Sequence, residues 1–169
     1  MSANRSIPAA ILAALVALGA AAADHRESRP AAGFHAIALA VPIEVEVTQG
    51  ANEAVVLEGE AAALAEIETV VEDGTLEIRL RREARGWRGP RWLSRGVRAY
   101  VTAPRVEALA VSGSGEIRAP ALRGDSLRVS IAGSGDVRVA GAVRELVARV
   151  AGSGDLRAAG LDCDTVTVS

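Results

Sequence analysis

The sequence has little of several residue types on which common folds and functional sites depend. Its 169 residues include one cysteine, which excludes an internal disulfide framework and a cysteine-rich zinc site. Aromatic residues make up only 2%, so the 50% of hydrophobic residues are nearly all Ala, Val, Leu and Ile. Lysine is absent, all 19 basic residues are arginine, and the net charge is −2. That charge excludes a generally basic nucleic-acid-binding protein, and the apolar content excludes a disordered polyelectrolyte.

The first 23 residues have the order of a secretory signal peptide. Arg5 gives a weakly positive start, residues 7–20 form an apolar run, and residues 21–23 are three alanines that suit a cleavage site. An uncleaved anchor is the alternative, but the run is shorter than the about 20 apolar residues that a membrane-spanning helix needs. No other segment could cross a membrane as a helix. We therefore expect a signal peptide at 1–23 and an exported protein that is periplasmic, outer-surface or extracellular.

Hydrophobic alternation predicts strands over most of the remaining chain. After a loose polar leader at 24–33, apolar and polar residues alternate at 43–48, 76–81 and 97–102, as in half-buried strands. No amphipathic helix of three turns is evident. The sequence therefore predicts an all-β domain over 34–169. Further expected elements are strands at 55–57 and 67–71, one helical turn at 61–66 and a loop at 82–96.

The C-terminal third, residues 113–169, is an internal repeat. A Gly-Ser-Gly triplet followed by an acid, an aliphatic residue and Arg occurs three times, and its first glycines are spaced by 20 and 19 residues. A fixed period near 20 is typical of a solenoid or β-helix. We expect coils of about 20 residues, each with two short strands, that stack with parallel pairing. The glycines expected at the sharp corners, where a positive φ has no steric cost, are Gly113, Gly115, Gly133, Gly135, Gly152 and Gly154.

Stacked repeats would place charged residues in columns on one face. An Arg column two residues after an acid column can offset the repulsion within each column. Calcium-binding β-rolls also repeat acids, but Ca²⁺ needs six to eight oxygen ligands and each coil here supplies one acid beside an Arg. We therefore expect structural columns and no metal site. The acids are Glu116, Asp136 and Asp155, and the arginines are Arg118, Arg138 and Arg157.

The last predicted strand stops at Ser169, just before another Gly-Ser-Gly triplet would begin. Two interpretations are open. The sequence is a truncated piece of a longer repeat, or the solenoid ends in an apolar edge that can pair with another chain. The second interpretation predicts a homo-oligomer formed through solenoid edges.

The predicted strands and the repeat together resemble the bacterial head GIN domain family, which is associated with autotransporter adhesins. The resemblance is carried by residues 34–37, 45–50, 67–78 and 97–104 and by the Gly-Ser-Gly repeats, and it covers most of 34–169. It implies an exported β-solenoid at the cell envelope. It supplies no catalytic residue and no cofactor.

Residues 81–98 are the strongest candidate binding segment. They contain seven Arg and one Glu, a net charge of +6, together with two tryptophans. Arg beside exposed Trp suits anionic glycans, lipid phosphates or sugar rings. The alternative is a solvated loop in which one Trp packs on the domain. Nucleic acid would fit the charge, but export argues against it. The candidate binding residues are Arg85, Trp87, Arg88, Arg91, Trp92 and Arg95.

No constellation of catalytic residues is evident. His25 and His35 have no second ligand cluster, and no serine lies in a nucleophile-elbow motif. Cys163 lies between Asp162 and Asp164, whose charges disfavour a reactive thiolate. The leading hypothesis is therefore a noncatalytic, cofactor-free, adhesin-like module that binds an anionic glycan or envelope surface. The alternatives are a self-associating structural solenoid and a polysaccharide lyase or hydrolase on a β-helix, which only the Asp and Arg columns support.

Overall fold

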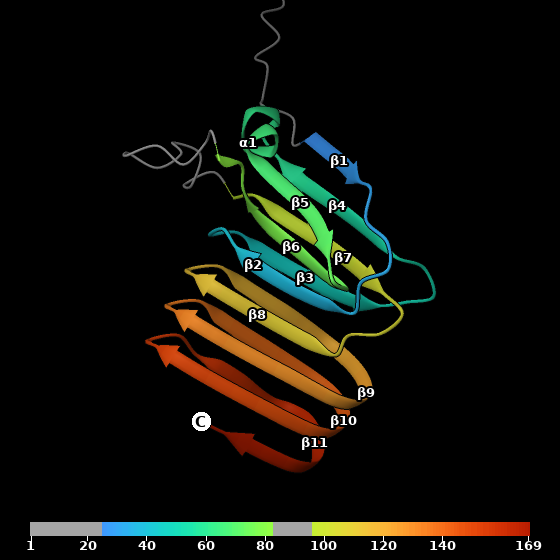
Figure 1. The fold of residues 1–169 in the computed structure, drawn as a ribbon, viewed down its shortest axis with the longest axis vertical. Coiled ribbons are helices and arrows are strands. Elements are labelled where there is room, and N and C mark those ends of the chain that lie inside the picture. The colour runs from blue at the N-terminus through green and yellow to red at the C-terminus, as the bar shows by residue number, and fades with distance from the viewer. Residues whose placement is uncertain (1–24, 83–95) are drawn as a thin grey trace, which may run out of the picture.

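In the computed structural model, residues 25–82 and 96–169 are described. Eleven strands in this part of the chain form one sheet, which confirms the all-β class (Figure 1). The helical turn expected at 61–66 is the short helix α1 (Ala61–Glu66). The strands are β1 (His25–Arg29), β2 (Ala36–Ala40), β3 (Glu44–Gln49), β4 (Ala54–Gly59), β5 (Ile67–Glu72), β6 (Thr75–Leu80), β7 (Arg98–Ala103), β8 (Ala108–Gly113), β9 (Glu116–Gly133), β10 (Asp136–Gly152) and β11 (Leu156–Val168).

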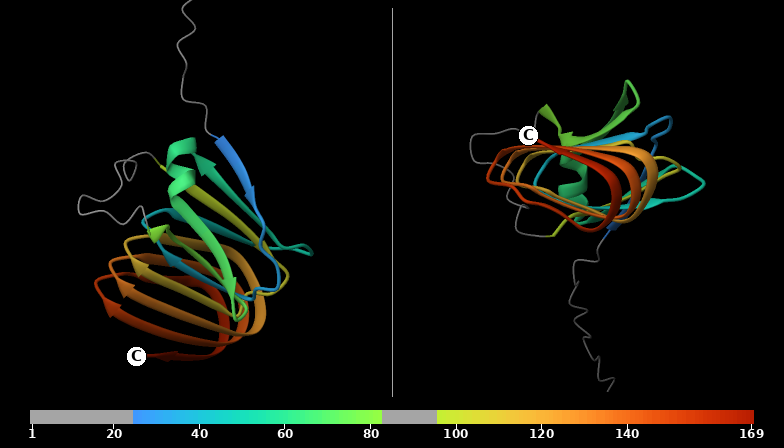
Figure 2. Two further views of the ribbon diagram at one scale, coloured as in Figure 1. Left: turned by 45° about the horizontal axis from the view of Figure 1, so that its top comes forward. Right: turned by 90° about the horizontal axis from the view of Figure 1, so that it is seen from below.

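The sheet folds round on itself and makes two walls that face each other across the core (Figure 2). The first wall follows the order β1-β4-β7-β3 to the start of β9, and the second runs from the end of β9 through β8-β2-β6 to β5. β9 passes through both walls because it bends at a corner in its middle. β10 and β11 follow the same path beneath it (Figure 1).

The C-terminal strands β9, β10 and β11 pair in parallel, and paired residues are 19 or 20 positions apart in the sequence, as the spacing of the repeat predicts. Leu127 of β9 lies beside Leu146 of β10, which lies beside Val166 of β11. We expected two separate short strands in each repeat, but the pairing continues through the corner, where Arg123 pairs with Ala142. The change from a 20-residue to a 19-residue offset falls at a register shift next to Gly141, whose φ is +126°. The left-handed conformation of Gly141 lets β10 pass this point with one residue fewer than β9.

The core between the two walls is aliphatic apart from Phe34. Leu127, Val129 and Ile131 point inward from β9 and are at most 1% exposed. Burying one Leu or Ile side chain contributes about 1.5–3 kcal/mol. Within the described ranges no polar or charged side chain is buried. The thin core therefore needs small branched side chains, which agrees with the scarcity of aromatic residues.

The helix α1 covers one end of the core (Figure 1). Its Ala63 and Leu64 are fully buried. Arg29 Nη2 donates a hydrogen bond of 2.8 Å to the carbonyl oxygen of Leu64, which ties β1 to the helix. No helix in the described part of the chain is long and apolar enough to cross a membrane.

Residues 25–29, expected to lie in a loose leader, form β1 instead. This strand pairs antiparallel with β4, from His25 beside Gly59 to Arg29 beside Val55. Its Arg26 forms an ion pair of 2.6 Å with Glu58 and lies over the ring of Tyr100. The hydrophobic pattern did not indicate this strand because an edge strand with polar side chains has no alternation to detect.

Candidate binding surfaces

Residues 83–95 of the segment expected to bind ligands lie outside the described residues, and so does the predicted signal peptide at 1–23. The role of this segment therefore stays a prediction. Its candidate residues are Arg85, Trp87, Arg88, Arg91, Trp92 and Arg95.

The first glycines of the three Gly-Ser-Gly corners are stacked on one another. Gly113 pairs with Gly133, and Gly133 pairs with Gly152. Their φ angles are +103°, +115° and +129°. This left-handed region strongly favours glycine, so the corners turn where the sequence pattern placed them.

The second glycine of each corner is required for a different reason from the expected one. Gly115, Gly135 and Gly154 do not have a positive φ, so that expectation is wrong for these three. A Cβ atom on Gly115 would lie 2.5 Å from Leu39 Cδ2 and 2.6 Å from the carbonyl oxygen of Val41. Close contact with the neighbouring coil therefore excludes a side chain at these positions.

Charged side chains form two adjacent rows on the outer face of the first wall. Parallel pairing puts one acid of each coil beside the acid of the next, and the arginines two residues further on line up in the same way. The acidic row begins on β3 and the arginine row on β9. The paired acids are Glu44, Glu116 and Asp136, and the paired arginines are Arg118, Arg138 and Arg157.

The two rows neutralise each other. Glu116 Oε1 lies 3.0 Å from Arg118 Nε and 2.7 Å from Arg138 Nη1. Asp155 Oδ2 lies 3.4 Å from Arg157 Nη2, which confirms the expected compensation between neighbouring columns. The hydrogen bond from Arg118 to Glu116, with the charges of Glu116 and Glu44, raises the pKa of Arg118 above its ordinary value. These arginines already have carboxylate partners, so we interpret the rows as structural. The described residues contain no group of three or more His, Cys, Asp or Glu placed to hold a metal ion.

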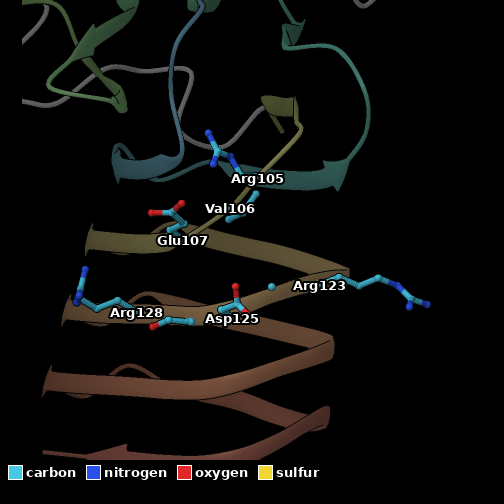
Figure 3. A pocket seen from close by; sticks show the side chains of 8 residues that line it. Arg105, Val106, Glu107, Arg123, Asp125 and Arg128 are labelled. Carbon is cyan, nitrogen blue, oxygen red and sulfur yellow. The ribbon is translucent and has the colours of Figure 1, made fainter.

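A hollow of about 320 Å³ opens where the loop after β7 meets the corner of β9 (Figure 3). In Figure 3, Arg105 lies above Glu107 and Arg128 lies below Glu107. Arg123 extends outward on the opposite side of the hollow. Asp125 lies on the β9 side, where its Oδ1 is 3.4 Å from Arg144 Nε. The lining residues are Arg105, Val106, Glu107, Arg123, Gly124, Asp125, Ser126 and Arg128.

The arginines of this hollow differ from those of the charged rows. The guanidinium groups of Arg105, Arg123 and Arg128 make no ion pair or hydrogen bond with any described residue. By contrast, Arg98, on the outer face of the first wall, has its Nε 3.5 Å from Glu44 Oε2. The hollow therefore concentrates cationic groups that are free to pair with an external anion.

Gln49 joins the two chain segments that frame the hollow. Its side-chain oxygen accepts a hydrogen bond of 2.7 Å from the backbone N–H of Arg123, and its Nε2 donates to the Arg123 carbonyl at 2.8 Å. The same Nε2 donates to the carbonyl oxygen of Pro104 at 3.3 Å. These bonds hold the loop before Arg105 against the corner of β9.

Sequence reasoning missed this hollow because its residues do not cluster along the chain. The sequence did contain an indication of it, because the 20-residue period of the repeat extends upstream of Gly113. Ala108 pairs with Arg128 at an offset of 20 residues, and Arg128 N–H donates to the carbonyl oxygen of Glu107 at 2.8 Å. Extending the period would have placed Ala108 beside Arg128 and so brought the two segments of the hollow together.

Known proteins resemble this chain mainly in fold. A protein from Parabacteroides distasonis described as a "putative lipid binding protein" has a TM-score of 0.71 and 19% identity over 86% of this chain. The chain spans 62% of that protein's length. A "putative adhesin" from Bacteroides fragilis has a TM-score of 0.65 and 16% identity, covering 86% of this chain and 75% of its own. A third, from Parabacteroides merdae, has a TM-score of 0.55 and 12% identity, with coverages of 86% and 77%.

A comparison with curated proteins gave no match. The family described as "Putative auto-transporter adhesin, head GIN domain" matches residues 33–169, which is most of the chain. The match begins just before β2 and runs through β11, so it includes every strand except β1, the hollow and all three Gly-Ser-Gly corners. The chain belongs to the head GIN domain family, as its repeat and strand pattern indicated.

Proposed function

We propose that the protein is an exported, noncatalytic module of the cell envelope that binds an anionic glycan through the hollow of Figure 3. The observation that carries the proposal is that Arg105 and Arg128 line the hollow and have no carboxylate partner among the residues that the structure describes. An Arg guanidinium pairs in a fork geometry with carboxylate, sulfate or phosphate. The chemistry of the hollow therefore favours a ligand with oxyanions.

The acidic residues of the hollow favour a sugar over a simple anion. Glu107 and Asp125 lie among the arginines, and their carboxylates can accept hydrogen bonds from hydroxyl groups. A uronic-acid chain carries both hydroxyls and regularly spaced carboxylates. A small inorganic anion would pair with the arginines but has no hydroxyl groups to donate hydrogen bonds to the two acids.

The predicted signal peptide at 1–23 supports export, and the family's adhesin description supports a binding role. Segment 85–95 supplies a second contact in this proposal, with Trp87 and Trp92 stacking on sugar rings. The parallel offsets of 19 and 20 residues between β8 and β11 support a solenoid scaffold for the module, with 34–169 as its single domain.

A binding assay tests the proposal. Purified protein is titrated with polygalacturonate, with neutral dextran and with vesicles containing anionic phospholipid, since one structural neighbour is described as a lipid binding protein. Saturable binding to polygalacturonate alone, weakened about tenfold or more by the double variant Arg105→Gln with Arg128→Gln, is expected. Arg26→Gln is the matched control, because Arg26 pairs with Glu58 on the first wall and neither residue lines the hollow. Binding to vesicles only, or equal binding by the double variant, would contradict the proposal.

A further inference from the structure

We infer that the glycan bound in the hollow of Figure 3 carries a neutral sugar next to its acidic sugar, and that the neutral sugar occupies a second hollow on the following coils. This inference rests on the proposed function and narrows its ligand class from any uronic-acid chain to a chain of mixed acidic and neutral sugars. It adds a second subsite and fixes the direction in which the ligand runs, which is across the strands.

The second hollow has a volume of about 420 Å³ and lies along the corners of the coils that follow the first hollow. Its lining includes Ala142 and Arg144 from β10, and Asp162 and Asp164 from β11. Gly124 of β9 lines both hollows. The two cavities therefore meet at Gly124.

Gly124 leaves the floor between the two hollows uncovered. A Cβ atom on Gly124 would have no heavy atom within 4 Å apart from its chain neighbours, and its φ is not in the left-handed region. Packing and backbone conformation therefore do not require a glycine here, although they do at Gly133. The missing side chain instead provides a continuous surface on which a chain ligand can lie.

The spacing of the coils fits a sugar chain. Arg123 of the first hollow pairs with Ala142, and Ala142 pairs with Asp162 of the second hollow. Paired strands lie about 4.8 Å apart. One pyranose unit of an extended glycan advances by a similar distance, so a chain that crosses the strands meets about one coil with each sugar. Neighbouring sugars therefore contact neighbouring coils.

The two hollows differ in charge. The first contains three arginines and two acids, a net charge of +1, whereas the second contains one arginine and two acids, a net charge of −1. An acidic sugar would pair with arginine in the first hollow but would meet the like charges of Asp162 and Asp164 in the second. The hydroxyl groups of a neutral sugar can donate hydrogen bonds to these two carboxylates. The charges therefore favour an acidic sugar followed by a neutral one.

Arg144 connects the two subsites. Its Nε lies 3.4 Å from Oδ1 of Asp125, an acid that lines the first hollow. The two side chains are 78% and 87% exposed, so solvent screens this ion pair and it contributes little to stability. The Arg144 guanidinium can therefore donate hydrogen bonds to a ligand oxygen at little cost.

Defined oligosaccharides test the order of the sugars. Hyaluronan tetrasaccharide alternates glucuronate with neutral N-acetylglucosamine, whereas tetragalacturonate is acidic in every unit. Calorimetric titration of the purified protein should give an affinity about tenfold or more higher for the hyaluronan tetrasaccharide. The double variant Asp162→Asn with Asp164→Asn should bring the two affinities together, because it removes the repulsion in the second hollow. The double variant Glu46→Gln with Glu72→Gln is the matched control, because it neutralises two exposed acids outside both hollows.

A side chain at Gly124 tests the path between the hollows. Gly124→Leu covers the shared floor and should weaken binding of the hyaluronan tetrasaccharide about tenfold or more. Gly124→Ala is the graded comparison and should weaken binding less, because its methyl group covers less of the floor. Circular dichroism checks that each variant is folded. Unchanged binding by folded Gly124→Leu would overturn the path across the coils.

The outcomes separate this inference from the proposed function. Binding of neither tetrasaccharide, or equal binding by the double variant Arg105→Gln with Arg128→Gln, would overturn both. Binding of tetragalacturonate as tight as that of the hyaluronan tetrasaccharide, and still weakened by that double variant, would overturn this inference and leave the proposed function standing. A preference for the hyaluronan tetrasaccharide that the two Asp→Asn substitutions leave unchanged would overturn the assignment of the neutral sugar to the second hollow.

Discussion

Gly133 lies beside Gly113 in the parallel pairing of β9 with β8, so close that no side chain fits between them. A Cβ atom on Gly133 would lie 2.7 Å from the carbonyl oxygen of Gly113. The φ of Gly133 is also +115°, which L-residues with side chains rarely adopt. One glycine thus allows both the sharp corner and the close stacking of successive coils.

Substituting this glycine should therefore destabilise the protein. Gly133→Ala should lower the free energy of unfolding by about 1–3 kcal/mol, because it adds backbone strain and a steric clash. Urea unfolding followed by circular dichroism measures the change. Gly124→Ala is the matched control, because Gly124 has open space around it and no positive φ. Equal losses in the two variants would show that the corner geometry does not carry the effect.

The thin core should be sensitive to the loss of single aliphatic side chains. Leu127 is fully buried, and Leu127→Ala should lower the free energy of unfolding by about 2–5 kcal/mol because it leaves a cavity between the walls. The neighbouring coil offers a control in Val147, which alternates with the buried Leu146 and Ala148 and is only half-buried. Val147→Ala should cost clearly less in the same urea experiment, and a larger cost would contradict the assignment of the two faces.

The charged rows should contribute little stability and depend on salt. Glu116→Gln removes the partner of Arg138 and one of the partners of Arg118. Both arginine side chains are about 40% exposed (42% and 39%), so solvent screens these pairs. We expect a loss below about 1 kcal/mol in urea unfolding at low salt, and a smaller loss at high salt. A loss that stays the same in high salt would contradict the electrostatic explanation. Glu72→Gln, an exposed acid on the edge strand β5, is the control.

Gln49 should stabilise the frame of the hollow. Gln49→Ala removes its hydrogen bonds to Arg123 and Pro104, which should cost about 1–2 kcal/mol and speed hydrogen exchange at the Arg123 amide. Gln49→Glu is a graded comparison, because it keeps an acceptor for the Arg123 N–H and loses only the donor. Exchange at the Arg123 amide should therefore remain slower in Gln49→Glu than in Gln49→Ala. Mass spectrometry of exchanged peptides gives the measurement, and no difference between the variants would contradict the assigned bonds.

Some of the candidate surfaces follow from the sequence and others do not. The charged rows follow, because parallel stacking at a constant period brings Glu116 beside Asp136 and Arg118 beside Arg138. The hollow does not, because Arg105 and Arg128 lie on separate segments that meet only after folding. The strand β1 was missed as well, because its polar residues pair with β4 through backbone groups that leave no mark in the hydrophobic pattern.

The sequence by itself determined the all-β class, the family and the positions of the repeating corners. These properties are local, since alternation and the glycine spacing act through backbone conformation and side-chain burial within each coil. Only the tertiary structure decided why Gly115 must be glycine and which arginines keep carboxylate partners. These depend on contacts between residues far apart along the chain, where the position of one coil against the next sets the distance between their atoms.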